Sequence, residues 1–158
     1  MGQYVVYDNA YTNSTANTYD NFIQLVTETN YYVAVKRIFI SFPSSYGNLS
    51  PNALYNFTLQ FRTLSASVSG GVTATPQLLN TLSTPASLST VTVKIGSTAF
   101  PVGVSVNVFG NVNINELLYY DWRALSEQEA FYFTGVFSIV AESNGVSRPL
   151  YVELEWDE

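Results

Sequence analysis

Carboxylates are the only side chains in this sequence that could form a catalytic pair. Glycoside hydrolysis needs two carboxyl groups about 5 to 10 Å apart, one on each side of a substrate. The candidate pairs are Glu127 with Glu129, Glu116 with Asp121, and Glu153 with Glu155. Residues two apart on one strand meet that distance without flanking a substrate, and acids near a helix start or a chain end are ordinarily solvated. We therefore expect no catalytic residue and no enzymatic activity.

The chain lacks the side chains that most often catalyse reactions and bind metals. It contains no histidine and no cysteine, which removes the usual general base, thiolate chemistry and the commonest transition-metal ligands. A serine nucleophile would need a rarer base, and neither Lys36 nor Lys94 lies in such a motif. The acids of residues 153–158 could offer oxygen ligands, but no segment has the Gly-centred spacing of a calcium loop. The sequence predicts neither a metal site nor a cofactor.

Charged residues are few and mostly acidic. They make up 11% of the chain, against about a quarter in ordinary domains. The formal net charge is −6, and the basic residues are scattered: Lys36, Arg37, Arg62, Lys94, Arg123 and Arg148. A protein that binds the phosphate backbone needs a basic patch, so we expect no direct contact with nucleic acid.

Aromatic side chains offer a second kind of site. They make up 15% of the chain, and the candidates are Trp122 and Trp156 together with the tyrosine pairs Tyr31–Tyr32 and Tyr119–Tyr120, of which Tyr119, Tyr120 and Trp122 follow closely on one another. Such a group could form an exposed platform on which sugar rings stack. Aromatic residues on strands also pack in cores and interfaces, so the sequence leaves both interpretations open.

Alternation of apolar and polar residues dominates the chain and predicts an all-β fold. Segments of this kind lie at residues 4–7, 21–29, 31–42, 54–62, 90–96, 101–110, 112–122, 130–143 and 149–156. The segment 31–42 is apolar on both faces except at Lys36, Arg37 and Ser41, which predicts a central strand. We expect about eight strands in a two-sheet antiparallel β-sandwich, formed as a single domain by residues 1–158.

The breaks between these segments carry further predictions. Residues 65–90 are rich in Ser, Thr and Ala and predict a long surface loop that neighbouring subunits hold in place. Asn144 and Gly145 form a favoured hairpin turn, which predicts that 130–143 and 149–156 are antiparallel neighbours. The sequence SEQE, Ser126 to Glu129, has the spacing of a capping box and predicts one or two helical turns.

The C-terminal segment PLYVELEWDE combines an apolar face with an acidic one. Alternation directs one set of residues into a core, namely Leu150, Val152, Leu154 and Trp156, and another set outward, namely Glu153, Glu155 and Asp157. A row of like charges protects an edge strand from indiscriminate pairing. We expect this acidic row to select a neighbouring chain by meeting Arg62 or Arg123 on that chain.

The surface chemistry is that of an extracellular β-protein, yet the N-terminus MGQYVVYDNA shows no basic segment followed by an apolar one, so we expect no secretory signal. A virion component fits both observations, because it is made in the host cytoplasm and works outside the cell. From YVVY to PLYVELEW, the chain resembles the single jelly-roll capsid proteins of tailless icosahedral viruses, particularly bacterial and archaeal viruses with an internal membrane.

This resemblance implies a capsid subunit with eight strands in a jelly-roll sandwich. Its partners would be copies of itself and other capsid proteins, and its location would be the virion. The chain departs from genome-binding capsid proteins because it lacks a basic N-terminal arm, which fits a shell that lies over a membrane or a membrane protein. Two alternatives stay open: a carbohydrate- or receptor-binding sandwich on an extracellular surface, such as a spike or fibre head, and a pilus-like fibre subunit.

Overall fold

The structure is a computed structural model that describes residues 2–11, 18–28, 31–41, 56–66, 71–79, 90–97, 106–115, 119–143 and 149–158. Within these ranges, only the backbone is described at residues 8–11, 18–22, 56–57, 96–97, 106–115, 141–143 and 149. The described part of the chain contains no helix that is long and apolar enough to cross a membrane.

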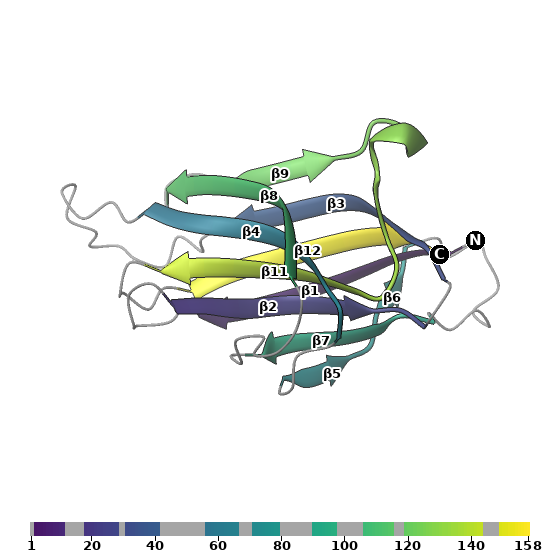
Figure 1. Cartoon of the computed structure of the whole chain (residues 1–158), viewed down its shortest axis with the longest axis horizontal. Coiled ribbons are helices and arrows are strands. Elements are labelled where there is room, and N and C mark those ends of the chain that lie inside the picture. The colour runs from purple at the N-terminus through teal and green to yellow at the C-terminus, as the bar shows by residue number, and fades with distance from the viewer. Residues whose placement is uncertain are drawn as a thin grey trace.

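Strands make up almost all of the regular structure, which confirms the all-β prediction (Figure 1). The strands are β1 (Gln3–Tyr11), β2 (Thr18–Val26), β3 (Val33–Ser41), β4 (Asn56–Leu64), β5 (Val72–Ala74), β6 (Gln77–Leu78), β7 (Thr92–Ser97), β8 (Val106–Asn115), β9 (Tyr120–Arg123), β10 (Phe131–Phe133), β11 (Val136–Ser143) and β12 (Pro149–Asp157). A single 3₁₀ turn, η1 (Glu127–Glu129), lies between β9 and β10.

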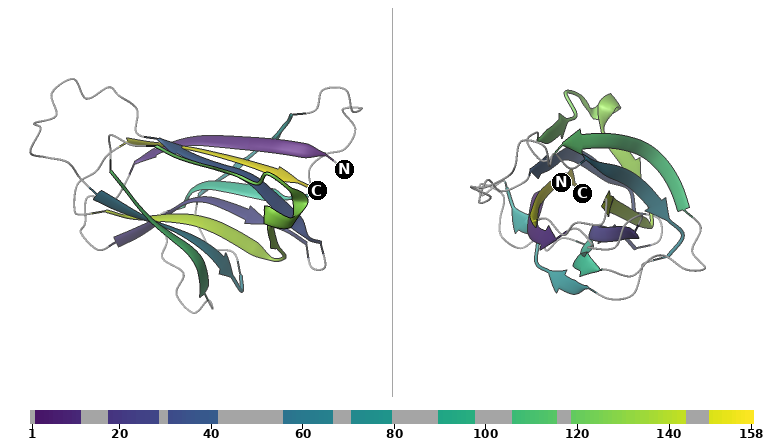
Figure 2. Two further views of the ribbon diagram at one scale, coloured as in Figure 1. Left: turned by 90° about the horizontal axis from the view of Figure 1, so that it is seen from above. Right: turned by 90° about the vertical axis from the view of Figure 1, so that its left-hand side faces the viewer.

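The strands form two antiparallel sheets that pack face to face, as Figure 2 shows. Sheet A has the strand order β10-β3-β12-β1-β6, and β9 also pairs with β3. Sheet B has the order β5-β7-β2-β11-β4-β8. The predicted two-sheet sandwich is therefore confirmed, and β3 is a central strand as its two apolar faces predicted.

The strand pairs are nested within one another. β1 pairs with β12, β2 with β11, β3 with β9 and β10, and β4 with β8. The chain thus resembles one long antiparallel hairpin that is wrapped into a sandwich, which is the strand order of a jelly roll. Three strands between β4 and β8 extend the sheets at their margins, because β7 pairs with β2, β5 with β7, and β6 with β1.

The hydrophobic core lies between the two sheets. The largest fully buried side chains are Trp156, Phe61, Phe137, Ile23, Leu25, Ile38, Ile40, Leu59, Ile139 and Leu150. On β12 the inward residues Leu150, Val152, Leu154 and Trp156 are each 0% exposed, as the alternation predicted. The ring of Tyr4 stacks on Trp156 with 5.9 Å between ring centroids, which ties β1 to β12 on the inner face as well.

Two predictions about the C-terminal strand are wrong. β12 lies between β1 and β3 in sheet A, whereas β11 lies between β2 and β4 in sheet B, so the two strands are not antiparallel neighbours. The chain crosses between the sheets after β11, and Asn144 and Gly145 themselves lie outside the described residues. β12 is also not an edge strand, because both of its sides have hydrogen-bonded neighbours. Its acids are tolerated in this central position because β3 supplies cations beside them.

The segment predicted as one strand at residues 130–143 is two strands in different sheets. β10 pairs with β3, and β11 pairs with β2 and β4. Between them, Gly135 has a φ of 87°, a left-handed conformation that favours glycine. Its N–H donates to Thr27 Oγ1 at 2.7 Å, and its carbonyl accepts from the Thr27 N–H at 2.8 Å. This glycine corner turns the chain from sheet A into sheet B.

The prediction of an unbroken loop over residues 65–90 is also wrong, because β5 and β6 lie within it. Both are very short, with 3 and 2 residues, so their sequences carry little strand signal. They form against strands that have other support, since β5 pairs with β7 and β6 pairs with β1. Residues 67–70 and 80–89 of this segment lie outside the described residues.

The helical turn predicted at Ser126 to Glu129 is present only as the single 3₁₀ turn η1. The capping box itself does not form, because Ser126 makes no side-chain capping hydrogen bond. Glu129 Oε2 instead accepts a hydrogen bond from the Leu125 N–H at 2.9 Å, one residue earlier than a capping box would place it.

The buried indole of Trp156 generates a stability prediction. We expect Trp156→Ala to lower the free energy of unfolding by about 3 to 5 kcal/mol, because it opens a cavity between the sheets. It also removes the hydrogen bond from Trp156 Nε1 to Glu158 Oε1 at 2.9 Å. Urea unfolding followed by circular dichroism measures the loss. Tyr119→Ala is the control, since Tyr119 is 69% exposed; a Trp156 variant as stable as this control would contradict the prediction.

Candidate functional site

The outer face of sheet A, the side turned away from sheet B, carries a cluster of charged side chains around a β-bulge. Glu155 of β12 lies opposite Arg37, but the next residue, Trp156, lies opposite Val35. The shift leaves Lys36 without a partner in the ladder, and both Lys36 and Arg37 are partly exposed. A bulge places two successive residues opposite one on the partner strand. It therefore brings two adjacent cations to the outer face.

The guanidinium of Arg37 joins three strands. Its Nε donates to Asp121 Oδ1 at 2.9 Å and its Nη2 donates to Asp121 Oδ2 at 3.3 Å, a two-pronged contact between β3 and β9. Its Nη1 donates to Glu155 Oε1 at 3.1 Å and also to Glu153 Oε1, both on β12. We call Arg37, Asp121, Glu153 and Glu155 the Arg37 network. The single cation of Arg37 contacts three carboxylates. Asp121 Oδ1 also lies 3.8 Å from Arg123 Nε, so the two arginines share this carboxylate.

These contacts shift the pKa values of the groups involved. The hydrogen bond to Asp121 contributes most to raising the pKa of Arg37, and that same bond lowers the pKa of Asp121 below its ordinary value. Burial, followed by the hydrogen bond from its hydroxyl to Glu153 Oε2 at 2.8 Å, raises the pKa of Tyr151 to about 12. At neutral pH Arg37 and Asp121 are therefore both charged, and Tyr151 is a hydrogen-bond donor.

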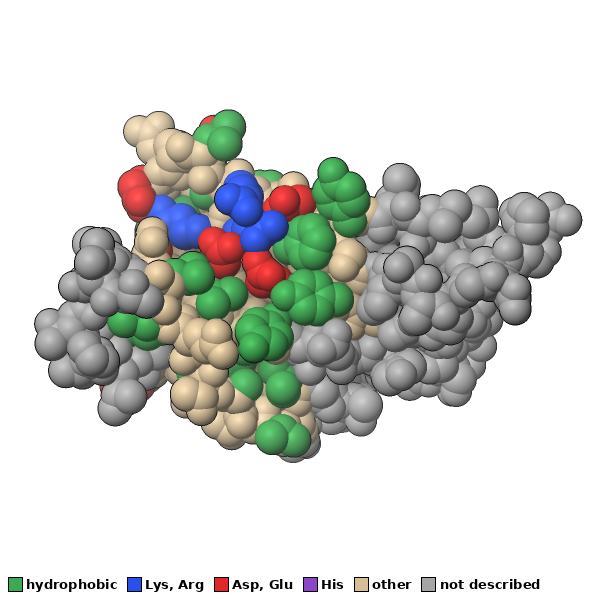
Figure 3. All heavy atoms as spheres, turned by 180° about the vertical axis from the view of Figure 1, so that it is seen from behind, with side chains coloured by type: hydrophobic (Ala, Val, Ile, Leu, Met, Phe, Trp, Pro, Cys, Tyr) green, Lys and Arg blue, Asp and Glu red, His purple; other side chains and the backbone are tan. Residues whose placement is uncertain are grey.

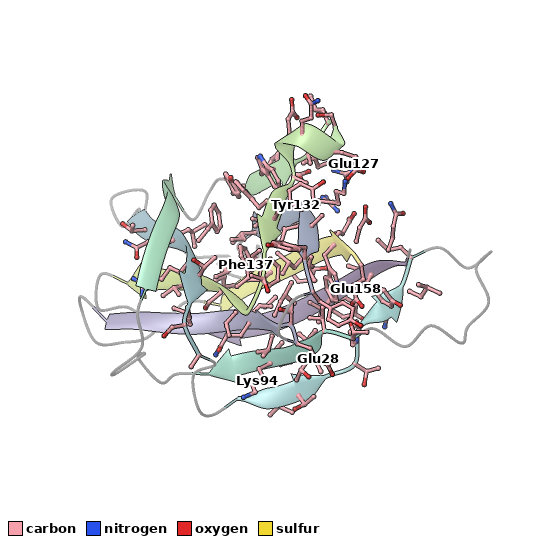
Figure 4. The ribbon with its side chains drawn as sticks, turned by 45° about the vertical axis from the view of Figure 1, so that its right-hand side comes forward. Glu28, Lys94, Glu127, Tyr132, Phe137 and Glu158 are labelled. Carbon is pink, nitrogen blue, oxygen red and sulfur yellow. The ribbon has the colours of Figure 1, made fainter. Side chains whose placement is uncertain are left out.

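Lys36 holds the η1 turn against the edge of sheet A. Its Nζ lies 2.5 Å from Glu127 Oε1 and 3.4 Å from Asp157 Oδ2. Burial disfavours the charged amine, but the contacts with Glu127 and Asp157 outweigh it and raise the pKa of Lys36. The hydroxyl of Tyr132 donates to the Glu127 carboxylate at 3.0 Å, and the two side chains lie near one another in Figure 4. An open hollow of about 260 Å³ lies beside the ion pair between Lys36 and Glu127.

Four aromatic rings form a line across the outer face, one after another from β1 to the start of β9. The ring of Tyr7 stacks on Tyr151 at 6.4 Å between centroids, Tyr151 meets Phe39 edge-on at 6.0 Å, and Phe39 meets Tyr119 at 6.1 Å. We call these four residues the aromatic row. Figure 3 shows hydrophobic side chains gathered directly beside the charged cluster on this face. Arg37 connects the two, because its guanidinium lies 5.1 Å from the centroid of the Phe39 ring.

The structure does not hold the candidate platform residues together, because Trp156 is fully buried and two of the others turn inward. Trp122 turns toward the core and stacks on Phe131 at 4.3 Å, and Tyr120 also turns inward and lies 5.6 Å from Phe61. Of Tyr119, Tyr120 and Trp122, only Tyr119 is exposed on the outer surface. The cause is the alternation of β9, which sends Tyr120 and Trp122 to one face and Asp121 and Arg123 to the other.

The predicted interface residues have partners within their own chain. Glu153 and Glu155 bind Arg37, and Asp157 binds Lys36, so each of these acids already has a cationic partner in its own chain. Arg62 is only 5% exposed, and its Nε donates to Gln60 Oε1 at 2.8 Å. Arg62 therefore cannot serve at an exposed interface. Arg123, whose side chain is 58% exposed, remains available on the surface.

The carboxylate pairs considered for catalysis are held in structural contacts. Glu153 and Glu155 share Arg37, Glu127 binds Lys36, and Glu129 accepts from the Leu125 N–H. Glu116 lies outside the described residues. Among the residues that are described, no three acidic side chains are grouped so as to hold a metal ion.

The Arg37 network predicts that one arginine stabilises sheet A far more than its neighbour does. We expect Arg37→Met to lower the free energy of unfolding by about 2 to 3 kcal/mol, because it leaves three carboxylates without their shared cation. Arg123→Met is the matched control and should cost less than about 1 kcal/mol, since exposed ion pairs contribute little. Urea unfolding at neutral pH compares the two, and equal losses would contradict the assigned role of Arg37.

The lowered pKa of Asp121 predicts a pH dependence. A carboxyl whose pKa is lower in the folded than in the unfolded state adds stability above its unfolded pKa and loses it as the pH falls through the folded pKa. The stability difference between the wild type and Asp121→Asn should therefore be full at neutral pH and shrink below about pH 4. Urea unfolding over a pH series measures this difference. A difference that stays constant down to acidic pH would show that Arg37 does not favour the ionised Asp121.

Known proteins supply no function for this site. Comparisons of the chain with protein-family models, with curated proteins and with solved structures find no match. The function must therefore be argued from the outer face of sheet A and from the strand order that creates it.

Proposed function

We propose that this protein is a structural subunit of a virion shell, and that copies of it contact one another or other capsid proteins through the outer face of sheet A. The observation that carries this proposal is the aromatic row. Tyr7 and Tyr119, at its two ends, are 49% and 69% exposed, and Phe39 and Tyr151 between them are partly exposed. Tyrosine and phenylalanine are enriched in protein interfaces, where they supply a large contact area at a low cost in side-chain entropy.

The surroundings of the row match the anatomy of an interface. The charged groups beside it are already paired by Arg37, so a partner would not need to separate or neutralise them. The row thus forms an apolar strip with a fixed polar rim. Jelly rolls occur in capsid proteins and in lectins, and the fold alone does not choose between these functions.

The packing of the rings favours a protein partner over a sugar. Tyr7 and Tyr151 stack on each other with only 23° between their planes, so these rings cover part of one another's faces. A sugar-binding platform needs ring faces that are open to the ligand. The formal charge of −6 also supports a shell protein whose contacts are with other proteins and not with the genome. Such a protein would be made in the host cytoplasm and would work in the virion.

A carbohydrate- or receptor-binding module is the second candidate. It is favoured by the exposure of Tyr119 and of the Arg123 side chain, which place an aromatic ring and a hydrogen-bond donor on the same face of sheet A. Binding of the monomer to a glycan array, with loss of binding in Tyr119→Ser, would support this candidate over the shell protein.

Removal of the exposed rings tests the shell proposal. We expect the wild type to form discrete oligomers and shell-like particles, and Tyr7→Ser/Tyr119→Ser to weaken the association at least tenfold, about 1.4 kcal/mol. Sedimentation velocity over a concentration series and negative-stain electron microscopy provide the readouts. Tyr31→Ser/Tyr32→Ser is the matched control, because these tyrosines are 53% and 71% exposed outside the row. A wild type that never forms higher oligomers, or equal weakening by both variants, would overturn the proposal.

A further inference from the structure

Strand β8 forms one edge of sheet B. In the described part of the chain it pairs only with β4, through a register that runs from Asn56 opposite Asn115 to Leu64 opposite Val106. The register shifts once, between Phe61 and Arg62, and is regular from Gly110 to Asn115. An edge strand presents a row of N–H and C=O groups that have no partner in their own sheet. The regular half of β8 is therefore a template for one more strand.

The other strands at the sheet edges are short or carry charge, and β1, whose pairing with β6 covers only Tyr4 and Val5, carries Asp8. β5 has 3 residues, β6 has 2 and β10 has 3. β9 has 4 residues and carries both Asp121 and Arg123. Short length and charge are the usual means by which proteins prevent edge pairing. β8 has 10 residues, VNVFGNVNIN, with no charged residue and no proline.

We propose that two copies of this chain pair along the regular half of β8, antiparallel and across a two-fold axis, so that sheet B continues from one copy into the other. Antiparallel pairing of a strand with its own copy is geometrically self-complementary and closes at a dimer. The chemistry also favours a second copy as the occupant. The side-chain amides of asparagine both donate and accept hydrogen bonds, so an asparagine of one copy can pair with an asparagine of the other. The regular half of β8 contains three of them, Asn111, Asn113 and Asn115.

Electrostatics point to the same contact. Each copy carries a formal charge of −6, so most surfaces of two copies repel one another. β8 contributes no charge to that repulsion, and the β4 positions opposite Asn111 and Asn113 are the uncharged Gln60 and Thr58. This inference does not depend on the shell proposal, because the β8 contact lies in sheet B and does not involve the aromatic row.

Two added lysines test the pairing. In the β4–β8 register, Asn111 and Asn113 lie opposite Gln60 and Thr58, which are partly exposed, so these two positions belong to the face of sheet B that Gln60 and Thr58 occupy. In the antiparallel pair, Asn111→Lys/Asn113→Lys would bring like charges together across the two-fold axis. We expect the dissociation constant of the dimer to rise at least tenfold. Gln3→Lys/Thr92→Lys is the matched control, since these exposed residues lie on β1 and β7, which have neighbours on both sides.

The measurement is made in the Tyr7→Ser/Tyr119→Ser background, so that contacts through the aromatic row do not contribute. Light scattering after size exclusion should give a mass twice the 17.5 kDa of one chain. Of the two lysine pairs, only Asn111→Lys/Asn113→Lys should lower the measured mass to that of one chain. Amide hydrogen exchange in the protein without added lysines should show protection of residues 110–115 that increases with concentration. A monomer at every concentration, equal effects of both lysine pairs, or unchanged exchange would overturn the proposal. Open-ended filaments would overturn the two-fold pairing, because they require a head-to-tail contact.

Discussion

The guanidinium of Arg37 holds together the charged side chains on the outer face of sheet A. Glu153 and Glu155 lie about 7 Å apart on one face of β12, and Asp121 approaches the same point from β9. Three carboxylates in this position would repel one another without a cation between them. Arginine fits because its planar group donates in several directions at once, whereas a lysine ammonium is a single point charge. The bulge that presents Arg37, the pairing of β9 with β3 and the ring of Phe39 beside the guanidinium all serve this arrangement.

The inner face of the structure could be predicted from the sequence, and much of the outer face could not. Alternation alone placed Leu150, Val152, Leu154 and Trp156 in the core, because burial requires only that apolar residues share a face. The partners of Glu153 and Glu155 depend instead on which strands are neighbours and on a bulge, and neither has a local signal. Two adjacent cations within the apolar segment 31–42 were the one available indication of that bulge. Tyr119 to Trp122 were ambiguous because four residues of alternation do not reveal which parity faces inward.

The structure separates two kinds of surface. The outer face of sheet A has side chains that are fixed by ion pairs and ring contacts, whereas the edge of sheet B at β8 is defined by its backbone and its lack of charge. A shell cannot be built from one two-fold contact, because such a contact is complete at a dimer. A lattice requires a second, independent surface on each subunit. The shell proposal therefore gains from the presence of two surfaces that differ in chemistry and belong to different sheets.

The nested pairing also determines when the chain can fold during its synthesis. Gln3 lies opposite Asp157, so β1 has no main neighbour until β12 has been made. The innermost pair, β4 with β8, is available much earlier, and pairs that join distant segments form slowly. At a translation rate of about 5 to 20 residues per second, β1 remains without its partner β12 for several seconds or longer. The outer face of sheet A consequently cannot form on a growing chain before β12 has left the ribosome, and copies growing on one messenger RNA cannot join through it until then.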